Sequence, residues 1–282
     1  MLKFYTPDRK GKQEPYSYRA RARLVGKCID NIGQAFSNDI VVLGRIHKEK
    51  DVESLRNNNI SYIHDICDNK WPELEKLWSN TNEHAIAITT TCGELKKLIE
   101  TKTDKPVYIV PDPTEREQEP INFETKKVYN ACYYGSYGNL KQIDWNKYDL
   151  SKVNLQKMSD QGPITWSFEA QGKMVRESDL VLLPVNNDHA MTKYKGHNRP
   201  IDAIRQGKFV ITNATIPSWV KLKDYMWVGD INEGIKWAIN NPNEVIKKVG
   251  DGQSFVEEFY TPEKVSTIWE WVYNNVCDTR NT

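Results

Sequence analysis

Short apolar runs alternate with segments of helical period along most of this chain. In the first half the apolar runs lie at 2–5, 39–44, 61–64, 85–89 and 106–110. Helical patterns separate them at 18–36, 51–57, 71–78 and 92–100. Strands that are separated by helices form βαβ units, whose strands lie parallel in one sheet. The alternation therefore predicts an α/β fold.

One segment interrupts the alternation. Residues 111–126 are charged and rich in proline and lack a hydrophobic period, which is typical of a linker. A second alternating series starts at 127–134 and continues with strands near Val153, Leu180, Phe209 and Met226. We therefore predict two Rossmann-like domains, at 1–118 and 119–261. A C-terminal helix over 262–282 then packs either on its own domain or back on the first one.

Composition limits the classes of partner and compartment. The 39 basic and 38 acidic residues leave a net charge of +1, so no basic stripe points to nucleic acid. No apolar stretch approaches the ~20 residues that a bilayer span needs, and the first residues resemble a strand more than a signal peptide. The five scattered cysteines lack CxxC spacing. We expect a cytoplasmic protein with reduced thiols, no bound metal and at most peripheral membrane contact.

A polar loop with several basic residues follows the apolar run 178–185. It carries Lys195 and Arg199 and leads into a short helix that Pro200 opens. Free backbone N–H groups and the helix dipole both favour an anion at such a helix N-terminus. We expect a diphosphate there, with Asp202 in the first helical turn within reach of the bound group.

This segment resembles the nucleotide-sugar site of glycosyltransferases of the GT-B fold. In that family, basic residues and helix amides hold the diphosphate, and an acidic residue one turn into the helix holds ribose or sugar hydroxyls. The resemblance assigns these roles to Lys195, Asn198, Arg199 and Asp202. Retaining members carry two glutamates eight positions apart in this region. Tyr194 and Asp202 occupy those positions here, which leaves the donor sugar and the stereochemistry open.

Two more segments of the second half supply donor-site candidates. Gly135, Ser136, Gly138 and Asn139 follow a strand and precede a helix, where glycine allows a ligand to approach the backbone closely. The resemblance identifies them with the glycine loop of the donor domain, and the alternative is an ordinary turn. Trp166 lies where similar enzymes hold the nucleobase, and the alternative is a buried core tryptophan.

The first half supplies candidates for the acceptor or phosphate side. Ser17, Arg19 and Arg21 open the helix predicted over 18–36, and they either contact a ligand or form a solvated basic face. Asp65 and Asp68 are three positions apart after a strand, so one of them is a candidate general base for an inverting transfer. Asp68 is equally a candidate helix N-cap. Both segments resemble bacterial polysaccharide-type glycosyltransferases.

The resemblance implies a hexosyltransferase with parallel sheets in two domains and an active site in the interdomain cleft. It would move a sugar from a nucleotide sugar, whose base is open, to a hydroxyl of a glycan or lipid-linked saccharide in polysaccharide biosynthesis. Asp202 and Asp65 are its candidate catalytic residues. No Asp-x-Asp pattern follows a strand, which suits a transfer that uses basic residues in place of a metal.

Three other functions remain open at this point. A GT-B-type nucleotide-sugar epimerase would isomerise its substrate without an acceptor. A non-catalytic nucleotide-sugar- or glycan-binding protein would bind without transfer. A phage-type DNA glucosyltransferase would use DNA as the acceptor, although the near-neutral charge of the chain does not predict a nucleic-acid partner.

Overall fold

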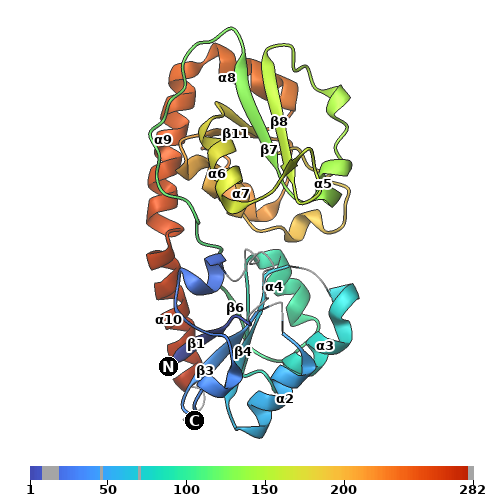
Figure 1. Ribbon diagram of the computed structural model, residues 1–282, viewed down its shortest axis with the longest axis vertical. Helices are drawn as coiled ribbons and strands as arrows, with labels where there is room; N and C mark the ends of the chain where they lie inside the picture. Colours follow the sequence, from blue (N-terminus) through green and yellow to red (C-terminus); the bar gives the residue numbers. More distant parts are fainter. Residues whose placement is uncertain (8–18, 45–46, 69–70, 279–282) are drawn as a thin grey trace. The chain divides into compact units, whose positions relative to one another are not determined.

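The structure is a computed structural model that describes residues 1–7, 19–44, 47–68 and 71–278. Its contacts divide the chain into two compact units (Figure 1). The first unit comprises 1–115, 194–196 and 259–282, and the second comprises 116–193 and 197–258. The sequence predicts this boundary between residues 118 and 119 and a separate last helix from residue 262 onward, whereas the contacts place the boundary after residue 115 and the last helix in the first unit.

The first unit contains a six-stranded sheet in the order β2-β1-β3-β4-β5-β6, and every pair of neighbours is parallel. Its strands are β1 (Leu2–Tyr5), β2 (Lys27–Ile29), β3 (Ile40–Leu43), β4 (Ser61–Ile66), β5 (Ala87–Thr90) and β6 (Val107–Ile109). Its helices are α2 (Glu49–Asn57), α3 (Trp71–His84), α4 (Gly93–Glu100) and α10 (Pro262–Asp278). Two short helical turns, η1 (Arg19–Arg23) and η2 (Ile32–Gln34), flank β2.

The last helix contributes to the core of the first unit. α10 lies along the sheet beside β1 in Figure 1. One face of the helix, which includes Val265, Trp269 and Val272, is buried in the same cluster as Phe4 and Ile40. These side chains recur at a helical period, so a single face of α10 covers the sheet.

The structure contradicts the long helix predicted over 18–36. Over the described residues 19–36, only η1 and η2 are helical, and Lys27–Ile29 pairs with β1 as a parallel edge strand. Gly26 packs so closely on Phe4 that a Cβ would collide with its ring, and Asn31 caps η2 by accepting a hydrogen bond from Gly33. Glycine and asparagine thus break a pattern whose apolar spacing alone suits a helix.

The second unit contains another six-stranded parallel sheet, in the order β12-β11-β10-β7-β8-β9. Its strands are β7 (Tyr129–Tyr134), β8 (Val153–Ser159), β9 (Ile164–Thr165), β10 (Leu180–Leu182), β11 (Phe209–Thr212) and β12 (Trp227–Val228). Its helices are α5 (Tyr137–Lys141), α6 (Phe168–Arg176), α7 (Asn198–Arg205), α8 (Ile231–Asn240) and α9 (Pro242–Phe259), with short turns η3 (Trp145–Lys147), η4 (Thr192–Tyr194) and η5 (Pro217–Leu222). The predicted α/β class with two parallel sheets is confirmed, and the interdomain cleft stays a prediction.

The predicted linker is packed along much of its length. Residues 116–126, which we call the strap, form neither helix nor strand and run beside α9 in Figure 1. The backbone N–H of Glu119 donates to the carbonyl of Arg205 at 3.0 Å, and the Gln253 amide donates to the carbonyl of Glu119 at 2.8 Å. Phe123 is buried in the core of the second unit. The strap is therefore a fixed part of this unit.

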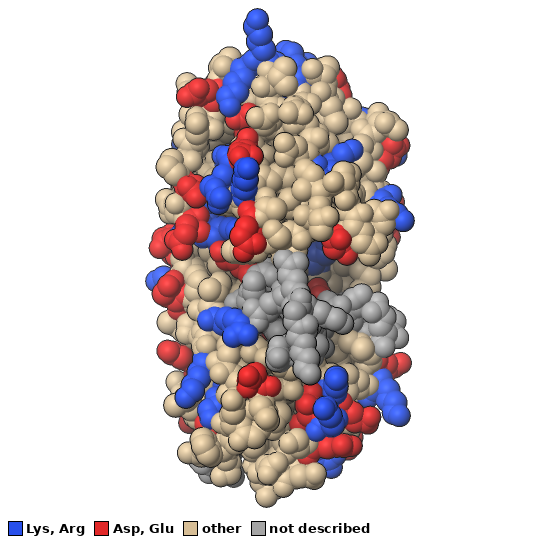
Figure 2. All heavy atoms as spheres, viewed as in Figure 1, with Lys and Arg blue, Asp and Glu red and all other residues tan. Residues whose placement is uncertain are grey.

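The surface carries charges of both signs. On the face shown in Figure 2, the Lys and Arg side chains of described residues are interspersed with Asp and Glu, in line with the net charge of +1. Within the described part of the chain, no helix combines the length and the apolar character that crossing a bilayer requires.

Candidate functional site

The topology of the second unit marks one edge of its sheet as the place for a ligand. From β7 the chain builds β8 and β9 on one side, and it then crosses back to place β10, β11 and β12 on the other. The winding therefore reverses between β7 and β10. In open α/β sheets, ligands bind outside the carboxyl ends of the strands at such a reversal. Gly135 directly follows β7, and Arg199 lies in the helix that follows β10.

Two hydrogen bonds join β7 to α7 at this edge. The Tyr134 hydroxyl donates to the backbone carbonyl of Arg199 at 2.8 Å, and Nη1 of Arg199 donates back to the carbonyl of Tyr134 at 3.3 Å. Tyr134 is 5% exposed, so its hydroxyl is shielded from water. The reciprocal pair fixes the position of the guanidinium beside the glycine loop.

Gly135 is required by the close approach of these groups. A Cβ at this position would lie 2.7 Å from the Tyr133 hydroxyl and 3.2 Å from Nη1 of Arg199. The first distance is too short for any real Cβ, and both neighbours are held, Tyr133 by burial against Trp145 and Arg199 by Tyr134. The predicted donor residues Gly135 and Arg199 are therefore neighbours in the structure.

The guanidinium of Arg199 has no carboxylate partner among the described residues. It donates to the Tyr134 carbonyl and also interacts with the Tyr133 hydroxyl. The residue is half-buried, and its Cζ lies 5.8 Å from the ring of Trp219. A guanidinium carries five N–H donors, so most of them remain available to an anion.

Two tyrosines reflect the polarity of this environment. Burial raises the pKa of Tyr133, and the charge of Arg199 opposes that shift. Burial, followed by the negative charge of Asp202, raises the pKa of Tyr134 well above its ordinary value. Both hydroxyls therefore stay protonated at neutral pH, and Tyr134 remains a donor to the Arg199 carbonyl.

The remaining residues of the glycine loop are partly engaged. Ser136 is the N-cap of α5 and accepts a hydrogen bond from the N–H of Asn139 at 3.3 Å, while Asp160 accepts one from the N–H of Tyr137 at 2.7 Å. A Cβ at Gly138 would meet no atom within 4 Å. α5 thus offers open space beside Gly138 but few vacant amides for a phosphate.

Asp202 lies deeper in α7 than predicted. The helix begins at Asn198, which is half-buried, so Asp202 is its fifth residue and lies beyond the first turn. The predicted favourable effect of the dipole on Asp202 is therefore wrong, since it fades after the first turn. Asp202 is 5% exposed. Its catalytic and ribose-binding roles stay predictions, as does donor binding by Asn198.

Lys195 groups with the first unit. The segment 194–196 belongs to that unit, where Tyr194 packs on the cluster of Trp78, Leu95 and Ile99. The role of Lys195 at a diphosphate therefore stays a prediction.

Trp166 follows β9 directly and is half-buried, so it is neither a fully buried core residue nor a freely exposed one. Its backbone N–H donates to the carbonyl of Ser159 at 2.9 Å, which ties it to the end of β8. The carboxyl ends of β7, β8 and β9 form one edge of the parallel sheet. Trp166 therefore lies on the edge that carries Gly135, and nucleobase binding stays a prediction.

The first unit contains a buried ion cluster at the carboxyl ends of β4 and β6. Nε and Nη2 of Arg21 donate to the two carboxylate oxygens of Asp65 at 2.9 and 2.6 Å, and Nη1 donates to Asp112 at 3.1 Å. The Thr89 hydroxyl also donates to Asp65, at 2.8 Å. Arg21, Asp65 and Asp112 are all at least 95% buried.

The charges in this cluster are strongly coupled. Burial opposes the charge of Arg21, but Asp65 and Asp112 outweigh it and raise the pKa of the guanidinium. Burial raises the pKa of Asp112 to about 6, against the attraction of Arg21. Both oxygens of Asp65 are already occupied by donors, which suits a structural anion more than a base that must accept a proton. The role of Asp65 in catalysis stays a prediction.

The other acceptor-side candidates are less well placed. Ser17 and the side chain of Arg19 lie outside the described residues. Arg21 is 1% exposed, which contradicts the solvated basic face, and its contact with a ligand stays a prediction. Asp68 is exposed, and its N-cap role stays a prediction because residues 69 and 70 are not described.

Sequence reasoning missed the residues that hold Arg199 and Arg21. Tyr134, Trp219 and Asp112 have no motif of their own, and only the Tyr-Tyr-Gly sequence at the end of a strand signals Tyr134. In the described ranges, no group of three His, Cys, Asp or Glu side chains is arranged to hold a metal ion.

No protein-family model and no curated protein matches this sequence. Several solved structures do match. TarM superposes with a TM-score of 0.61 at 12% identity, over 85% of this chain and 55% of TarM. The α,α-trehalose 6-phosphate synthase of Burkholderia multivorans gives 0.59 at 7% identity, over 89% and 73% of the two chains. An α-glucosyltransferase in complex with UDP gives 0.59 at 10% identity, over 84% and 80%.

These likenesses extend over most of this chain, which spans about half the length of TarM. The two parallel sheets with their helices have the GT-B fold of glycosyltransferases, as the resemblance implied. At such low identities the comparisons establish the fold alone.

Proposed function

We propose that this protein is a glycosyltransferase that moves a sugar from a nucleoside-diphosphate donor to an acceptor hydroxyl. The observation that carries the proposal is Arg199, a half-buried guanidinium with no carboxylate partner in the described part of the chain. It lies beside Gly135 where the winding of the second sheet reverses. The solved α-glucosyltransferase with this fold holds UDP.

Arg199 would stabilise the departing diphosphate. As the bond between the sugar and the phosphate breaks, negative charge grows on the phosphate oxygens. Charge-assisted donors that are already in position then stabilise the transition state more than the ground state. The two hydrogen bonds with Tyr134 hold the guanidinium before the substrate arrives. The open space at Gly138 would admit the donor, and Trp166 would contact its base.

Nucleotide binding tests the donor site directly. Calorimetry on the full chain should detect binding of at least one of UDP, GDP, ADP and TDP. Arg199→Ala should weaken the binding of that diphosphate by ~1.5–3 kcal/mol, as expected for the loss of a hydrogen bond to a charged group. The binding free energy of the matching nucleoside should change much less. Lys236→Ala removes an exposed cation of the same unit, in α8, and should leave binding unchanged. If no nucleoside diphosphate binds, the donor-site proposal is wrong.

The proposal also covers the acceptor and the metal requirement of the transfer. We infer a glycan or lipid-linked saccharide in polysaccharide biosynthesis as the acceptor, and a metal-independent transfer in which cationic side chains stabilise the leaving group. A cytoplasmic location fits the five cysteines, since no disulfide joins them.

DNA is the second candidate acceptor. One solved α-glucosyltransferase is in complex with UDP-glucose and DNA, and it superposes with a TM-score of 0.55 over 84% of this chain and 80% of that chain. The present chain thus covers more of that enzyme than of TarM. A transfer assay with labelled donor should compare a duplex that contains hydroxymethylated bases with a lipid-linked saccharide. Label in the duplex alone would favour DNA, and label in the saccharide alone would exclude it.

A further inference from the structure

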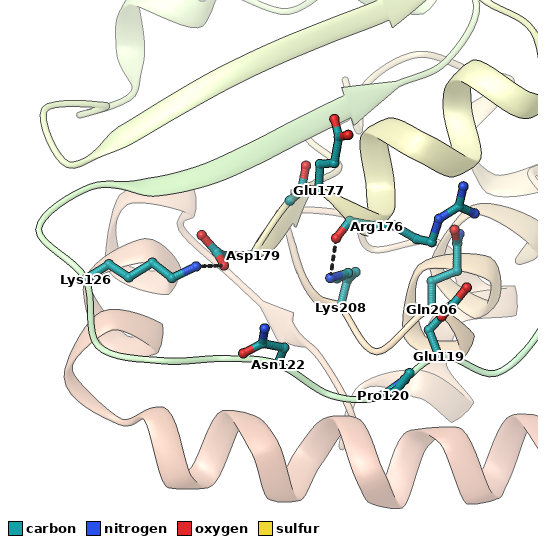
Figure 3. Close-up of a pocket in the computed structure, with 10 residues that line it drawn as sticks. Glu119, Pro120, Asn122, Lys126, Arg176, Glu177, Asp179, Gln206 and Lys208 are labelled. Atoms are coloured by element: carbon teal, nitrogen blue, oxygen red, sulfur yellow. Dashed lines mark hydrogen bonds and ion pairs between the residues drawn. The ribbon is translucent and has the colours of Figure 1, made fainter.

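A pocket opens at the edge of the second unit's sheet that lies opposite the proposed donor site (Figure 3). It has a volume of about 300 Å³. Three segments line it: the strap, the end of α6 with the residues that follow, and the turn from α7 into β11. Asp179 and Lys208 directly precede β10 and β11, so the pocket lies at the amino ends of the strands. Arg199 and Gly135 lie at the carboxyl ends.

Lys208 is the central cation of this pocket. Its side chain is buried, with the whole residue 6% exposed, and its Nζ donates to the backbone carbonyl of Arg176 at 2.8 Å. No carboxylate among the described residues lies within ion-pair distance of this ammonium. Burial lowers the pKa of Lys208, and Asp179 opposes the shift from a distance. A buried ammonium without a counter-ion is costly, which makes an anion a favourable occupant.

The neighbouring acids do not neutralise this charge. Asp179 is already paired with Lys126 at 2.6 Å, and its second oxygen accepts a hydrogen bond from the N–H of Asn130 at 2.9 Å. Glu177 points away from Lys208 in Figure 3 and forms an ion pair with Lys173 at 3.8 Å.

Arg176 adds a second cation to the wall. It is exposed and has no carboxylate partner in the described part of the chain. The lining holds three cations, Lys126, Arg176 and Lys208, and three acids, Glu119, Glu177 and Asp179. With Asp179 paired to Lys126 and Glu177 to Lys173, Glu119 of the strap is the acid that remains beside Lys208 and Arg176.

Gln206 adds an unused acceptor to the same pocket. The residue is 1% exposed, and its Nε2 donates to the carbonyl of Asp202 at 3.1 Å. Its Oε1 is buried without a hydrogen-bond partner among the described residues. Leaving a buried acceptor unsatisfied costs about 1–3 kcal/mol, so a ligand that brings a hydroxyl donor would recover that cost.

The wall that carries these groups is fixed by the strap. Gly207 adopts φ +71°, and a Cβ there would lie 2.6 Å from the carbonyl oxygen of Pro120. The Gln253 amide also donates to the carbonyls of Glu119 and Arg205. Gln206 and Lys208 flank Gly207, so the acceptor and the cation are held in place before a ligand arrives.

We propose that this pocket binds a small hydroxylated anion, namely a phosphate monoester of a sugar or polyol. The phosphate would contact Lys208 and Arg176, and a hydroxyl of the ligand would donate to Oε1 of Gln206. The pocket is separate from the proposed donor site and does not depend on glycosyl transfer.

Calorimetry on the full-length Arg199→Ala variant tests this proposal, because that change weakens phosphate binding at the donor site. Glucose 1-phosphate should bind saturably, inorganic phosphate should bind more weakly because it lacks sugar hydroxyls, and glucose alone should not bind. Adding Lys208→Met should lower the affinity for glucose 1-phosphate about tenfold or more, as the loss of a hydrogen bond from a charged donor predicts. Adding Lys236→Met removes an exposed lysine of α8 in the same unit, away from the pocket lining, and should change nothing.

A second measurement separates a ligand site from a structural lysine. If Lys208 serves a ligand, Lys208→Met should keep or raise the melting temperature without ligand and should abolish the rise that glucose 1-phosphate causes. If Lys208→Met does not fold, Arg176→Ala in the same background carries the test, because Arg176 is exposed. Failure of both phosphate probes to bind overturns the proposal. So does binding that survives removal of the cation.

Discussion

Replacing Asp65 with asparagine should destabilise the first unit far more than it affects the chemistry of a folded enzyme. Asp65 receives three hydrogen bonds, two from Arg21 and one from Thr89, inside a fully buried cluster. Asparagine has the same shape but keeps only one acceptor oxygen. Its NH₂ group would face an N–H donor of Arg21, which leaves that donor unsatisfied.

The size of this destabilisation depends on the hydrogen bonds that Arg21 retains in the variant. Breaking a buried ion pair typically costs 3–5 kcal/mol, because the other charge stays buried without compensation. In the variant, Arg21 retains its hydrogen bonds to the carbonyl of Val110 at 2.7 Å and to the carboxylate of Asp112 at 3.1 Å. Removing the charge of Asp65 also favours ionisation of Asp112, whose pKa is raised to about 6 partly by that charge. We therefore expect the lower end of the range, about 3 kcal/mol.

Native-state amide hydrogen exchange is the suitable assay, because two units need not unfold in one transition. Peptides from β4 and β5 should exchange about a hundredfold faster in Asp65→Asn, which is the equivalent of 3 kcal/mol. Peptides from β7 and β10 in the second unit serve as an internal control. Asp104→Asn is the matched variant, since Asp104 is exposed in the same unit and should change stability by less than about 0.5 kcal/mol.

The opposite pattern would refute this reasoning. If Asp65→Asn keeps wild-type exchange in β4 and β5 but loses sugar transfer, then Asp65 acts in catalysis and the ion cluster contributes little to stability. If Asp65→Asn loses both the protection from exchange and the sugar transfer, Arg21→Met separates the two causes. That change should reproduce the instability, and it removes no candidate base.

Three further predictions concern pH, metal and the donor helix. His64 is fully buried, and burial lowers its pKa to about 3, so between pH 6.5 and pH 3 the unfolded chain takes up a proton on this residue and the folded chain does not. The stability advantage of wild type over His64→Gln should therefore shrink by about 2 kcal/mol by pH 5. A difference in stability that does not change with pH would contradict this. Sugar transfer should survive EDTA, and a loss that Mg²⁺ or Mn²⁺ restores would overturn metal independence. Asp202→Asn should lower turnover with a modest effect on the melting temperature, and full activity would remove Asp202 from the site.

Local sequence patterns predicted the sheets but not the edge strand β2. Runs such as Ile40–Leu43 and Phe209–Thr212 are apolar or β-branched throughout, as expected for strands buried on both faces. Lys27–Ile29 has only three residues, and its strand pairing depends on contacts with β1 that no local pattern shows. Its apolar residues equally fit the helix predicted over 18–36, so tertiary pairing decided the outcome.

The candidate site shows the same limit. Gly135 and Arg199 are predictable as candidates because a glycine after a strand and a basic residue at a helix start are local signals. The partners that position the two arginines lie far away in sequence. Tyr134 is 65 positions from Arg199, and Asp112 is 91 positions from Arg21. A buried hydrogen bond across such a separation is a property of the folded chain, so a single sequence cannot reveal it.

Tyr134 is therefore the sharpest test of the donor site beyond Arg199 itself. Tyr134→Phe removes the 2.8 Å hydrogen bond to the carbonyl of Arg199 but keeps the carbonyl that Arg199 Nη1 contacts. Stability should fall by about 1 kcal/mol for one buried hydrogen bond. Because the guanidinium loses part of its support, the affinity for a nucleoside diphosphate should fall while the affinity for the nucleoside does not.

Tyr129→Phe is the matched control on the same strand. Its hydroxyl accepts a hydrogen bond from the N–H of Lys126 at 3.2 Å, at the other end of β7. This variant should lose a similar amount of stability and keep the wild-type affinity for the diphosphate. Equal diphosphate affinities in the two variants would mean that Tyr134 only supports the fold. A loss confined to Tyr134→Phe would mean that the end of β7 positions Arg199 for phosphate, which is how the reversal point between β7 and β10 would become a donor site.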